Sequence, residues 1–272
     1  MGRIALIDAD VVTYSCAFAA QKKLYAIDQI VFSNKKEAIL EANNLGISTL
    51  EINEIFNIAP ESHAIYDAKL LLQKITKAVS AEDYKLYLSS ESKENTYRYK
   101  LDSSYKENRK EQARPHHYQT IRNYLINEWN AEVVDEIEAD DALGIAQFEY
   151  ANGCICTIDK DLDMIPGDHY NWRKDIIYYI SPEIAIRNFY LQMLIGDRVD
   201  NIKGIDGIGE VKANKLLPYH YSEKQMFDVV YKQYKHQYRS LSELDIFNIF
   251  IRNANLLWIQ RKLNQKWIPP QL

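Results

Sequence analysis

The chain has 272 residues, 47% of them hydrophobic, and its formal net charge at pH 7 is -5. This length and composition are typical of a soluble enzyme that folds as one large domain or as a domain with an appended lobe. No run of eighteen apolar residues is present, and the acidic Asp8 comes too early for a signal peptide, so we expect a cytoplasmic protein with no membrane partner. The three cysteines give neither a disulfide framework nor a zinc spacing.

The first part of the chain predicts strands that alternate with helices. Hydrophobic periodicity indicates a buried strand over 3–7, a helix over 11–23, an amphipathic helix over 67–80 and a second strand over 84–88. Residues 24–61 are less regular, with one helix over 34–44 and nothing that we can assign to chemistry.

The next segment, 89–115, is polar and charged. A long insertion of this kind in a compact domain is usually functional or mobile. From residue 98 to residue 114 it carries six basic residues against three acidic ones, whereas 132–141 has six acidic residues and no basic one. The negative average therefore conceals a segregation of charge and does not exclude nucleic acid, whose phosphates attract Lys and Arg. A solvated charged helix is the alternative.

Strands and helices alternate again after this insertion. The pattern predicts a helix over about 117–129, a strand over 132–134, a helix from 138 to about 150 and a strand over 154–158. Two further helices are expected over 223–238 and from 241 to about 263. The alternation predicts an α/β fold with a mainly parallel sheet.

Acidic residues follow four of the predicted strands, where each strand ends. In such sheets ligands collect at the carboxyl ends of the strands, so we expect these side chains to share one crevice. Gathered carboxylates repel one another or take up protons unless a cation is present, and oxygen ligands favour Mg²⁺ or Mn²⁺. For any one of these acids taken alone, capping of the following helix is a better explanation than metal binding. The presence of acids at four strand ends makes that explanation much weaker. The candidate metal ligands are Asp8, Glu91, Glu138, Asp140, Asp141, Asp159, Asp161, Asp197 and Asp200.

A glycine-rich turn over 204–209 indicates a second kind of chemistry. Its glycines, Gly204, Gly207 and Gly209, permit a tight turn and expose backbone amides at the start of a helix near residue 210, which is a ready anion site. The turn does not match a dinucleotide-binding motif, because it follows a helix and lacks the last glycine. A structural turn is the alternative, but the flanking basic residues Lys203, Lys212 and Lys215 favour a phosphate backbone.

In this order, five motifs together resemble the 5′ nucleases, a family of flap endonucleases, the 5′ nuclease domain of bacterial DNA polymerase I and bacteriophage 5′-to-3′ exonucleases. The motifs are Tyr-Lys-Glu-Asn-Arg at 105–109, Glu-Ala-Asp-Asp at 138–141, Thr-Ile-Asp-Lys-Asp-Leu at 157–162, the acidic stretch 196–201 and the turn 204–209. The resemblance spans roughly 3–217 and is greatest to the stand-alone phage enzymes, because no polymerase portion is present. If the protein is phage-encoded, we expect it in the host cytoplasm.

The resemblance implies a fold and a division of the chain. We expect a PIN-like α/β nuclease core over 1–184, with a central mainly parallel sheet and a helical arch over about 89–116. A helical lobe over 185–272 would contain a helix-three-turn-helix, a form of helix-hairpin-helix, at about 196–217. K⁺ bound at that motif is also implied.

The resemblance also implies roles for individual acids. Asp8, Glu138, Asp140 and Asp159 would hold one Mg²⁺ or Mn²⁺ closely, and Asp161, Asp197 and Asp200 would serve the second, partly through water. Glu91 departs from the family, which usually places Asp after Gly where this chain has Ser90 and Glu91. The longer side chain keeps the charge and is expected to alter metal preference.

The expected activity is two-metal-ion hydrolysis at the 5′ ends or flaps of duplex DNA, extending to RNA primers in hybrids, with replication proteins as partners. Lys106 and Arg109 would share a face of the helical arch with Lys110 and grip a phosphate, while Tyr105 would stack on a base or simply pack. Two other functions compete with this one. A PIN-class ribonuclease would not need the glycine turn, and a non-catalytic DNA-binding accessory protein is supported only by Glu91.

Overall fold

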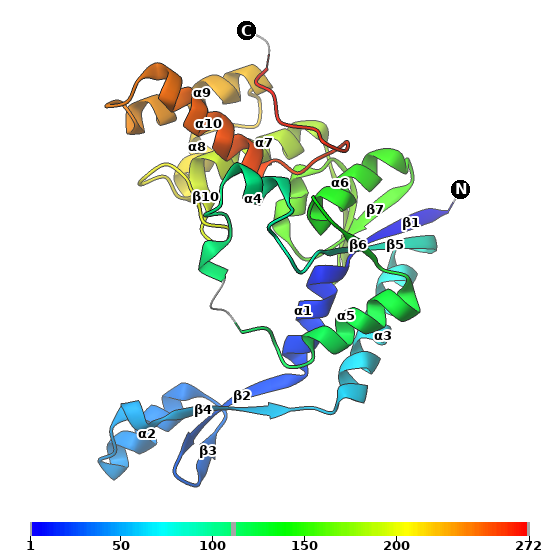
Figure 1. Ribbon diagram of the computed structural model, residues 1–272, viewed down its shortest axis with the longest axis vertical. Helices are drawn as coiled ribbons and strands as arrows, with labels where there is room; N and C mark the ends of the chain where they lie inside the picture. Colours follow the sequence, from blue (N-terminus) through cyan, green and yellow to red (C-terminus); the bar gives the residue numbers. More distant parts are fainter. Residues whose placement is uncertain (1, 110–112, 271–272) are drawn as a thin grey trace. The chain divides into compact units, whose positions relative to one another are not determined.

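The computed structural model describes residues 2–109 and 113–270, and its chain forms two compact units. The first unit takes Met1–Val11, Lys74–Gln112 and Trp129–Leu272, and the second takes Val12–Gln73 and Ala113–Glu128. The boundary expected near residue 184 does not separate these units, because the helices that follow it belong to the same unit as the central sheet. Figure 1 shows the elements of both units.

A six-stranded sheet organises the first unit, in the order β6-β5-β1-β7-β8-β9. Its strands are β1 (Arg3–Asp8), β5 (Ala81–Ser89), β6 (Glu132–Val134), β7 (Gly153–Cys156), β8 (Gly167–Asn171) and β9 (Ile176–Ile180). All neighbours are parallel except β8 and β9, which form an antiparallel hairpin at one edge. The mainly parallel sheet predicted from the sequence is therefore confirmed, and its buried central strand is the first one in the chain, where Ala5, Leu6 and Ile7 are fully buried.

Helix α6 (Ala139–Glu149) packs on this sheet through a continuous apolar core. Leu143 of the helix meets Leu6 of β1 and Ile155 of β7 in that core, together with Ile259 from the end of the chain. Because this late segment packs against the sheet, the C-terminal part of the chain is joined to the first unit.

The helical part of the first unit surrounds a separate aromatic core. Its elements are α7 (Pro182–Ile195), the hairpin β10 (Gly196–Asp197) and β11 (Ile202–Lys203), α8 (Glu210–Leu216), α9 (Glu223–Gln237) and α10 (Glu243–Leu257). Ser181, Ser222 and Ser242 cap three of these helices by accepting backbone N–H bonds, which explains where each helix begins. Phe189 and Phe250 pack with Trp267 in the core, so the segment after α10 contributes to it.

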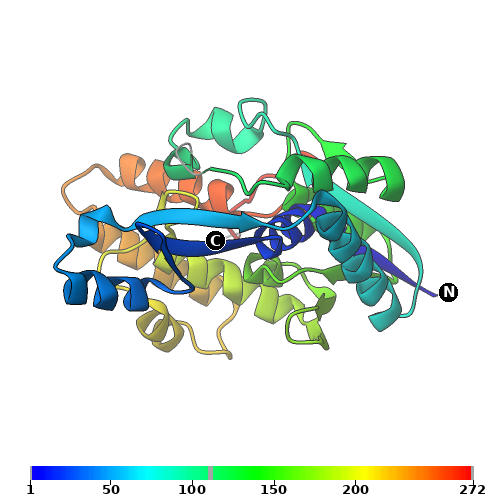
Figure 2. The same cartoon turned by 90° about the horizontal axis from the view of Figure 1, so that it is seen from below.

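The second unit contains a small antiparallel sheet that the sequence did not reveal. Its elements are β2 (Gln21–Ile27), β3 (Ile30–Phe32), α2 (Lys35–Leu45), the 3-10 helix η1 (Thr49–Glu51) and β4 (Asn53–Ile58), beside most of α1 (Ala9–Ala19), α3 (Glu61–Ala78) and α5 (Tyr118–Trp129). The helix predicted over 11–23 is therefore wrong at its end, because the chain turns into β2 and pairs with β4 on one side and β3 on the other (Figure 2).

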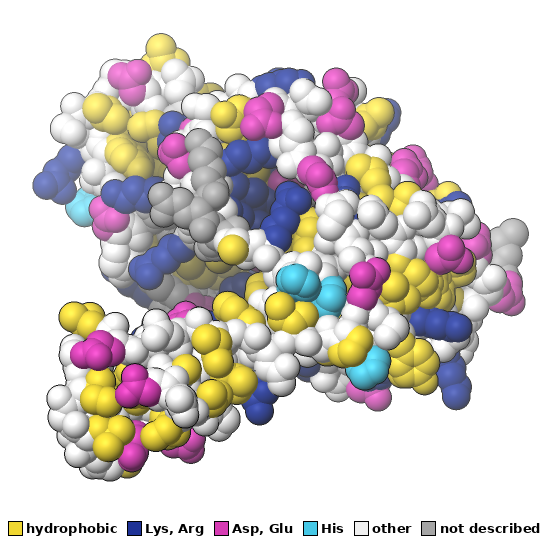
Figure 3. Space-filling view, turned by 60° about the horizontal axis from the view of Figure 1, so that its bottom comes forward, with side chains coloured by type: hydrophobic (Ala, Val, Ile, Leu, Met, Phe, Trp, Pro, Cys, Tyr) yellow, Lys and Arg dark blue, Asp and Glu magenta, His cyan; other side chains and the backbone are white. Residues whose placement is uncertain are grey.

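Only one face of the small sheet is covered. Ala38 and Ala42 of α2 pack on Ile27 of β2. Strand β4 stays exposed throughout, and Phe56 keeps 51% of its surface accessible. Figure 3 shows hydrophobic side chains gathered on the part of this unit that holds β2, β3, β4 and α2, at the lower left. Among the described residues, no helix has the length and apolarity needed to cross a bilayer.

Candidate metal centre

The carboxyl end of the central strand places Asp8 at the start of α1. The side chain is 1% exposed and both of its oxygens accept hydrogen bonds, one from Val11 N at 3.0 Å and the other from Thr157 Oγ1 at 2.8 Å. Thr157 follows the neighbouring parallel strand β7, so two strand ends meet here as expected. The bond from Val11 N also caps α1. Asp8 therefore both caps a helix and belongs to the acid cluster.

The acids of this edge are crowded enough to resist ionisation. Burial raises the pKa of Asp8 to about 7, and the charges of Asp10 and Asp159 add to the effect of burial. Burial, followed by the charges of Asp8 and Asp159, also raises the pKa of Asp140 well above its ordinary value. Burial and Asp159 raise the pKa of Asp161 to about 7. These carboxyls are short of positive charge, and a bound cation would relieve that shortage.

The donor set fits a hard divalent cation in its chemistry. Carboxylate oxygens are the preferred ligands of Mg²⁺ and Mn²⁺, and their raised pKa values show that they lie within electrostatic reach of one another. Within residues 2–109 and 113–270, no three Asp, Glu, His or Cys side chains already converge as a ligand set. Asp159 accepts a bond from Asp161 N at 2.9 Å as the N-cap of the 3-10 helix η3 (Lys160–Met164).

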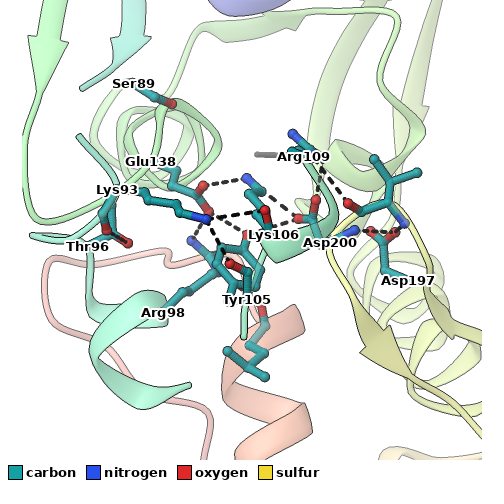
Figure 4. A network of polar contacts seen from close by, with 12 residues as sticks. Ser89, Lys93, Thr96, Arg98, Tyr105, Lys106, Arg109, Glu138, Asp197 and Asp200 are labelled. Atoms are coloured by element: carbon teal, nitrogen blue, oxygen red, sulfur yellow. Dashed lines mark hydrogen bonds and ion pairs between the residues drawn. The ribbon is translucent and has the colours of Figure 1, made fainter. Parts of the chain in front are cut away.

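Glu138 differs from these acids because protein cations neutralise it. Its Oε2 accepts bonds from Arg98 Nη1 at 2.9 Å and from the Tyr105 hydroxyl at 2.8 Å, and its Oε1 accepts a bond from Lys106 Nζ (Figure 4). Burial alone would raise the pKa of Glu138, but the ammonium of Lys106 and the guanidinium of Arg98 lower it to about 2. This acid is therefore charged and fully engaged.

The basic residues of the insertion contact the acids directly instead of forming one face of a helical arch. In the described part of the insertion only α4 (Tyr97–Leu101) and the 3-10 helix η2 (Glu107–Arg109) are helical, and Lys106 has a positive φ of 54°, which interrupts any helix there. Lys106 Nζ lies 3.6 Å from Oδ2 of Asp200, and Arg109 donates to the other oxygen of Asp200. The helical face predicted for these two residues is therefore wrong in this structure, and Lys110 lies outside the described residues.

The ring of Tyr105 is buried. Only 3% of the residue is exposed, and its hydroxyl lies 2.8 Å from Oε2 of Glu138 and 2.9 Å from Oδ2 of Asp200. Stacking on a base, one of the two roles considered for this residue, is not possible in this conformation. The contacts instead make it a bridge between two candidate metal ligands.

Three comparisons with known proteins bear on this arrangement. No family model matches the sequence. DNA polymerase I of Bacillus caldotenax is 28% identical over 180 residues, which are 57% of this chain and 20% of that protein, so the chain spans about a fifth of its length. The T5 D15 protein co-crystallised with metal ions matches 93% of this chain and 88% of its own with a TM-score of 0.52 and 14% identity. T5 5′-exonuclease with bound zinc gives the same values, and a point mutant of that enzyme gives 0.52 at 12% identity over 94% and 88% of the chains.

The chain has the fold of T5 5′-exonuclease. The resemblance to the 5′ nucleases that the motifs predicted is confirmed at the level of the fold, and the sequence likeness to DNA polymerase I agrees with it. Within this 5′ nuclease fold, the acid cluster lies at the carboxyl edge of the sheet, where β1 and β7 end.

Asp141 and Glu91, two of the candidate metal ligands, have surroundings different from those of Asp8, Asp140 and Asp161. Asp141 is fully buried and forms two hydrogen bonds with Arg98, at 2.5 Å and 2.9 Å, so its charge is already matched. Glu91 follows β5 and is exposed. Sequence reasoning missed Arg98 as a contact of the acids, since in the sequence it is one basic residue in a positively charged run.

A cleft of about 910 Å³ is lined both by three of the acids and by the glycine turn. Its lining includes Asp159, Asp161 and Asp197 together with Lys203 and the turn 204–209. The N-cap of α8 is Gly209, which has no side chain to accept a hydrogen bond from the first backbone amides of the helix. The flanking Lys212 and Lys215 are exposed.

The turn depends on glycine at two positions. Gly207 has a φ of 74°, which favours glycine. At Gly204 an added Cβ would lie 2.2 Å from the carbonyl carbon of Ile195, so the backbone of the turn and that of α7 approach each other too closely for any side chain. These constraints fix the path of the chain between the hairpin and α8.

Metal-free stability should depend on pH in a direction that the crowded acids set. Asp8, Asp140 and Asp161 have raised pKa values in the folded state, so their ionisation destabilises the fold as pH rises from about 4 through 7. In chelator, the free energy of unfolding should therefore be larger at pH 5 than at pH 8, by on the order of a few kcal/mol. The melting temperature should accordingly be higher at pH 5.

Asp140→Asn removes one of these charges at nearly constant volume, and it should raise the melting temperature at pH 8 and reduce the pH dependence. Circular dichroism melts with chelator across this range provide the measurement. A melting temperature that rises from pH 5 to pH 8, or a destabilised Asp140→Asn protein, would contradict the crowding of the acids.

Proposed function

We propose that the protein is a divalent-metal-dependent 5′ nuclease that hydrolyses phosphodiester bonds at the 5′ ends or flaps of duplex DNA. One observation carries the proposal: the charge-deficient carboxyl of Asp161 lines the same cleft as Asp159, Asp197 and the glycine turn. The acids supply a site for cations, and the turn offers backbone amides and lysines to a phosphate backbone. Cation chemistry and phosphate binding thus lie within one groove.

The ligand assignment follows from the resemblance to the 5′ nucleases. Asp8, Glu138, Asp140 and Asp159 would hold one Mg²⁺ or Mn²⁺, and Asp161, Asp197 and Asp200 would hold the second. When bound, the two ions supply an activated water and stabilise the charge on the leaving oxygen. Thr157 orients Asp8 through its 2.8 Å bond, and the backbone amides of Val199 and Asp200 orient Asp197 at 2.8 Å and 3.2 Å.

Lys106 and Arg109 would act on the substrate phosphate. In this structure both are held by Asp200, and Lys106 is also held by Glu138. A phosphate in the cleft competes with these carboxylates for the same cations, and its arrival would leave Asp200 and the Oε1 oxygen of Glu138 for metal coordination. The two residues would then bind the phosphate with charge-assisted hydrogen bonds.

Three finer parts of the proposal rest on the resemblance to the 5′ nucleases. They are K⁺ bound at the turn 204–209, action on RNA primers in RNA–DNA hybrids, and partnership with replication proteins. Each adds to the duplex-directed activity and can be tested with the same substrates.

Cleavage of a 5′-labelled duplex and of a matched 5′-flap substrate tests the activity. With Mg²⁺ or Mn²⁺ we expect short 5′ products, with chelator none, and with the Asp159→Asn protein none, because Asp159 is a proposed metal ligand whose charge acts on both Asp8 and Asp161. A duplex with an RNA 5′ segment extends the test to hybrids. Duplex binding without cleavage under either metal would favour the accessory-protein function, and cleavage of single-stranded RNA alone would favour the ribonuclease.

Two lysines should affect different steps. Lys106→Ala should lower kcat by about 10²-fold with little change in duplex affinity, because we place its ammonium at the reacting phosphate. Lys212→Ala should weaken duplex binding and lower the slope of log affinity against log salt by about one, because we place it on the DNA backbone.

Lys174→Ala is the matched control for the loss of one exposed charge, since Lys174 lies on the hairpin between β8 and β9. Binding by fluorescence anisotropy at several salt concentrations and single-turnover cleavage separate the two steps. Equal effects of both lysine variants on both quantities would refute this division of roles.

A further inference from the structure

Arg98 is a buried arginine that contacts a proposed metal ligand. It is 3% exposed and lies in α4, within the basic insertion. Its Nη1 donates to Oε2 of Glu138 at 2.9 Å and to Oδ2 of Asp141 at 2.5 Å, and its Nη2 donates to the other oxygen of Asp141 at 2.9 Å. The guanidinium therefore lies between the two acids that begin α6.

The end of the chain holds the same guanidinium from the other side. Arg98 Nε donates to Leu256 O at 2.9 Å, and Nη2 donates to Trp258 O at 2.7 Å. Asp141 in turn accepts a bond from Gln260 N at 2.9 Å. A guanidinium has five N–H groups, and five hydrogen bonds fix this one, so its position and plane are determined by three segments that are distant in the sequence.

These contacts divide the two oxygens of Glu138. Oε2 is held by Arg98 and by the hydroxyl of Tyr105, both of which are buried, whereas Oε1 accepts a bond from the ammonium of Lys106. Figure 4 shows Arg98 and Tyr105 approaching Glu138 together, with Lys106 at its other side. One oxygen is therefore fixed by the fold, and the other is matched by a side chain that we assign to the substrate.

We propose that Arg98 is a positioning residue of the metal centre. It fixes Oε2 of Glu138 so that Oε1 is presented to a cation, and the backbone of residues 256–260 together with Asp141 fixes Arg98. The backbone of the C-terminal segment thereby contributes to a site formed by residues distant from it in the sequence. This inference rests on the metal centre proposed above.

A purely structural ion pair would not need the contact with Glu138. Asp141 alone matches the charge of Arg98 through two bonds, and the carbonyls of residues 256 and 258 satisfy further donors. The remaining Nη1 bond is directed at an acid of the metal centre. Residues that orient metal ligands in this way typically change metal affinity by about 10- to 100-fold when they are replaced.

Mn²⁺ binding to the full chain without DNA tests the proposal, with free Mn²⁺ measured by electron paramagnetic resonance. Arg98→Lys keeps the charge but loses the planar fork, and it should weaken Mn²⁺ affinity by about 10- to 100-fold. Arg187→Lys is the matched control, because Arg187 is 5% exposed and donates only to Leu217 O and Asn214 Oδ1. It should bind Mn²⁺ like the wild type. Unchanged affinity in a folded Arg98→Lys protein would overturn the proposal.

Asp141→Asn provides a second test, which decides the matter if Arg98→Lys does not fold by circular dichroism. It loosens the hold on Arg98 and leaves the carboxylate of Glu138 in place, and its amide oxygen can still accept the bond from Glu138 N that Asp141 accepts at 3.2 Å. It should also weaken Mn²⁺ affinity. If Asp141 acts through Arg98, the double variant should bind no more weakly than Arg98→Lys alone, whereas losses that multiply would show a direct ligand. Wild-type affinity in Asp141→Asn would overturn the proposal.

Cleavage measurements keep this inference separate from the proposed function. At saturating Mn²⁺ the Arg98→Lys protein should regain much of its activity, because a positioning defect in metal binding is overcome by mass action and a damaged fold is not. A wild type that cleaves DNA while Arg98→Lys binds Mn²⁺ normally would refute the inference alone. A wild type that shows the Arg98-dependent Mn²⁺ affinity but cleaves no DNA would refute the function alone.

Discussion

Repulsion between carboxylates at the carboxyl edge of the sheet is the constraint on which the rest of this structure depends. The edge is buried, so solvent screens the charges poorly and each acid raises the pKa of its neighbours. The structure reduces this repulsion in two ways. Asp8, Asp140 and Asp161 resist ionisation, whereas Glu138 is neutralised by Lys106 and Arg98.

The candidate site therefore has two halves with different chemistry, one formed by Asp8, Asp140 and Asp161 and the other by Glu138 and Asp200. The first half has charge that only a proton or an external cation can balance. The second half has its own cations, which come from the basic insertion and lie on Glu138 and Asp200. In the proposed function this arrangement would link metal binding to phosphate binding, because a phosphate that attracts the protein cations also increases the need for metal at the carboxylates.

The segment after α10 packs against two hydrophobic cores of the first unit and also contacts the second half of the candidate site. The segment after α10 adds Trp258 and Trp267 to the aromatic core and Ile259 to the core beneath α6. Its backbone carbonyls accept hydrogen bonds from Arg98, and one of its backbone amides donates a hydrogen bond to Asp141. Packing energy from large apolar side chains thus holds a polar network in place, and that network orients an acid of the proposed metal centre.

The sequence by itself determined the sheet and the grouping of its acids. Apolar runs such as 3–7 and 154–158 predict buried parallel strands, and parallel strands bring their carboxyl ends together whatever the side chains are. Local patterns could not show the small sheet of β2, β3 and β4, where tertiary pairing overrode a helical reading of Lys22 and Lys23.

Only the tertiary structure decided which acid faces which partner. Adjacent acids such as Asp140 and Asp141 are equivalent in the sequence, yet one lies among carboxylates and the other on Arg98. The sequence predicts Lys106 on one face of a helical arch and leaves Tyr105 either stacked on a base or packed, and in the structure both side chains contact the distant carboxylate of Glu138. The positive φ of Lys106 interrupts any helix there. Such outcomes depend on contacts between residues 30 to 160 positions apart, and no local spacing encodes them.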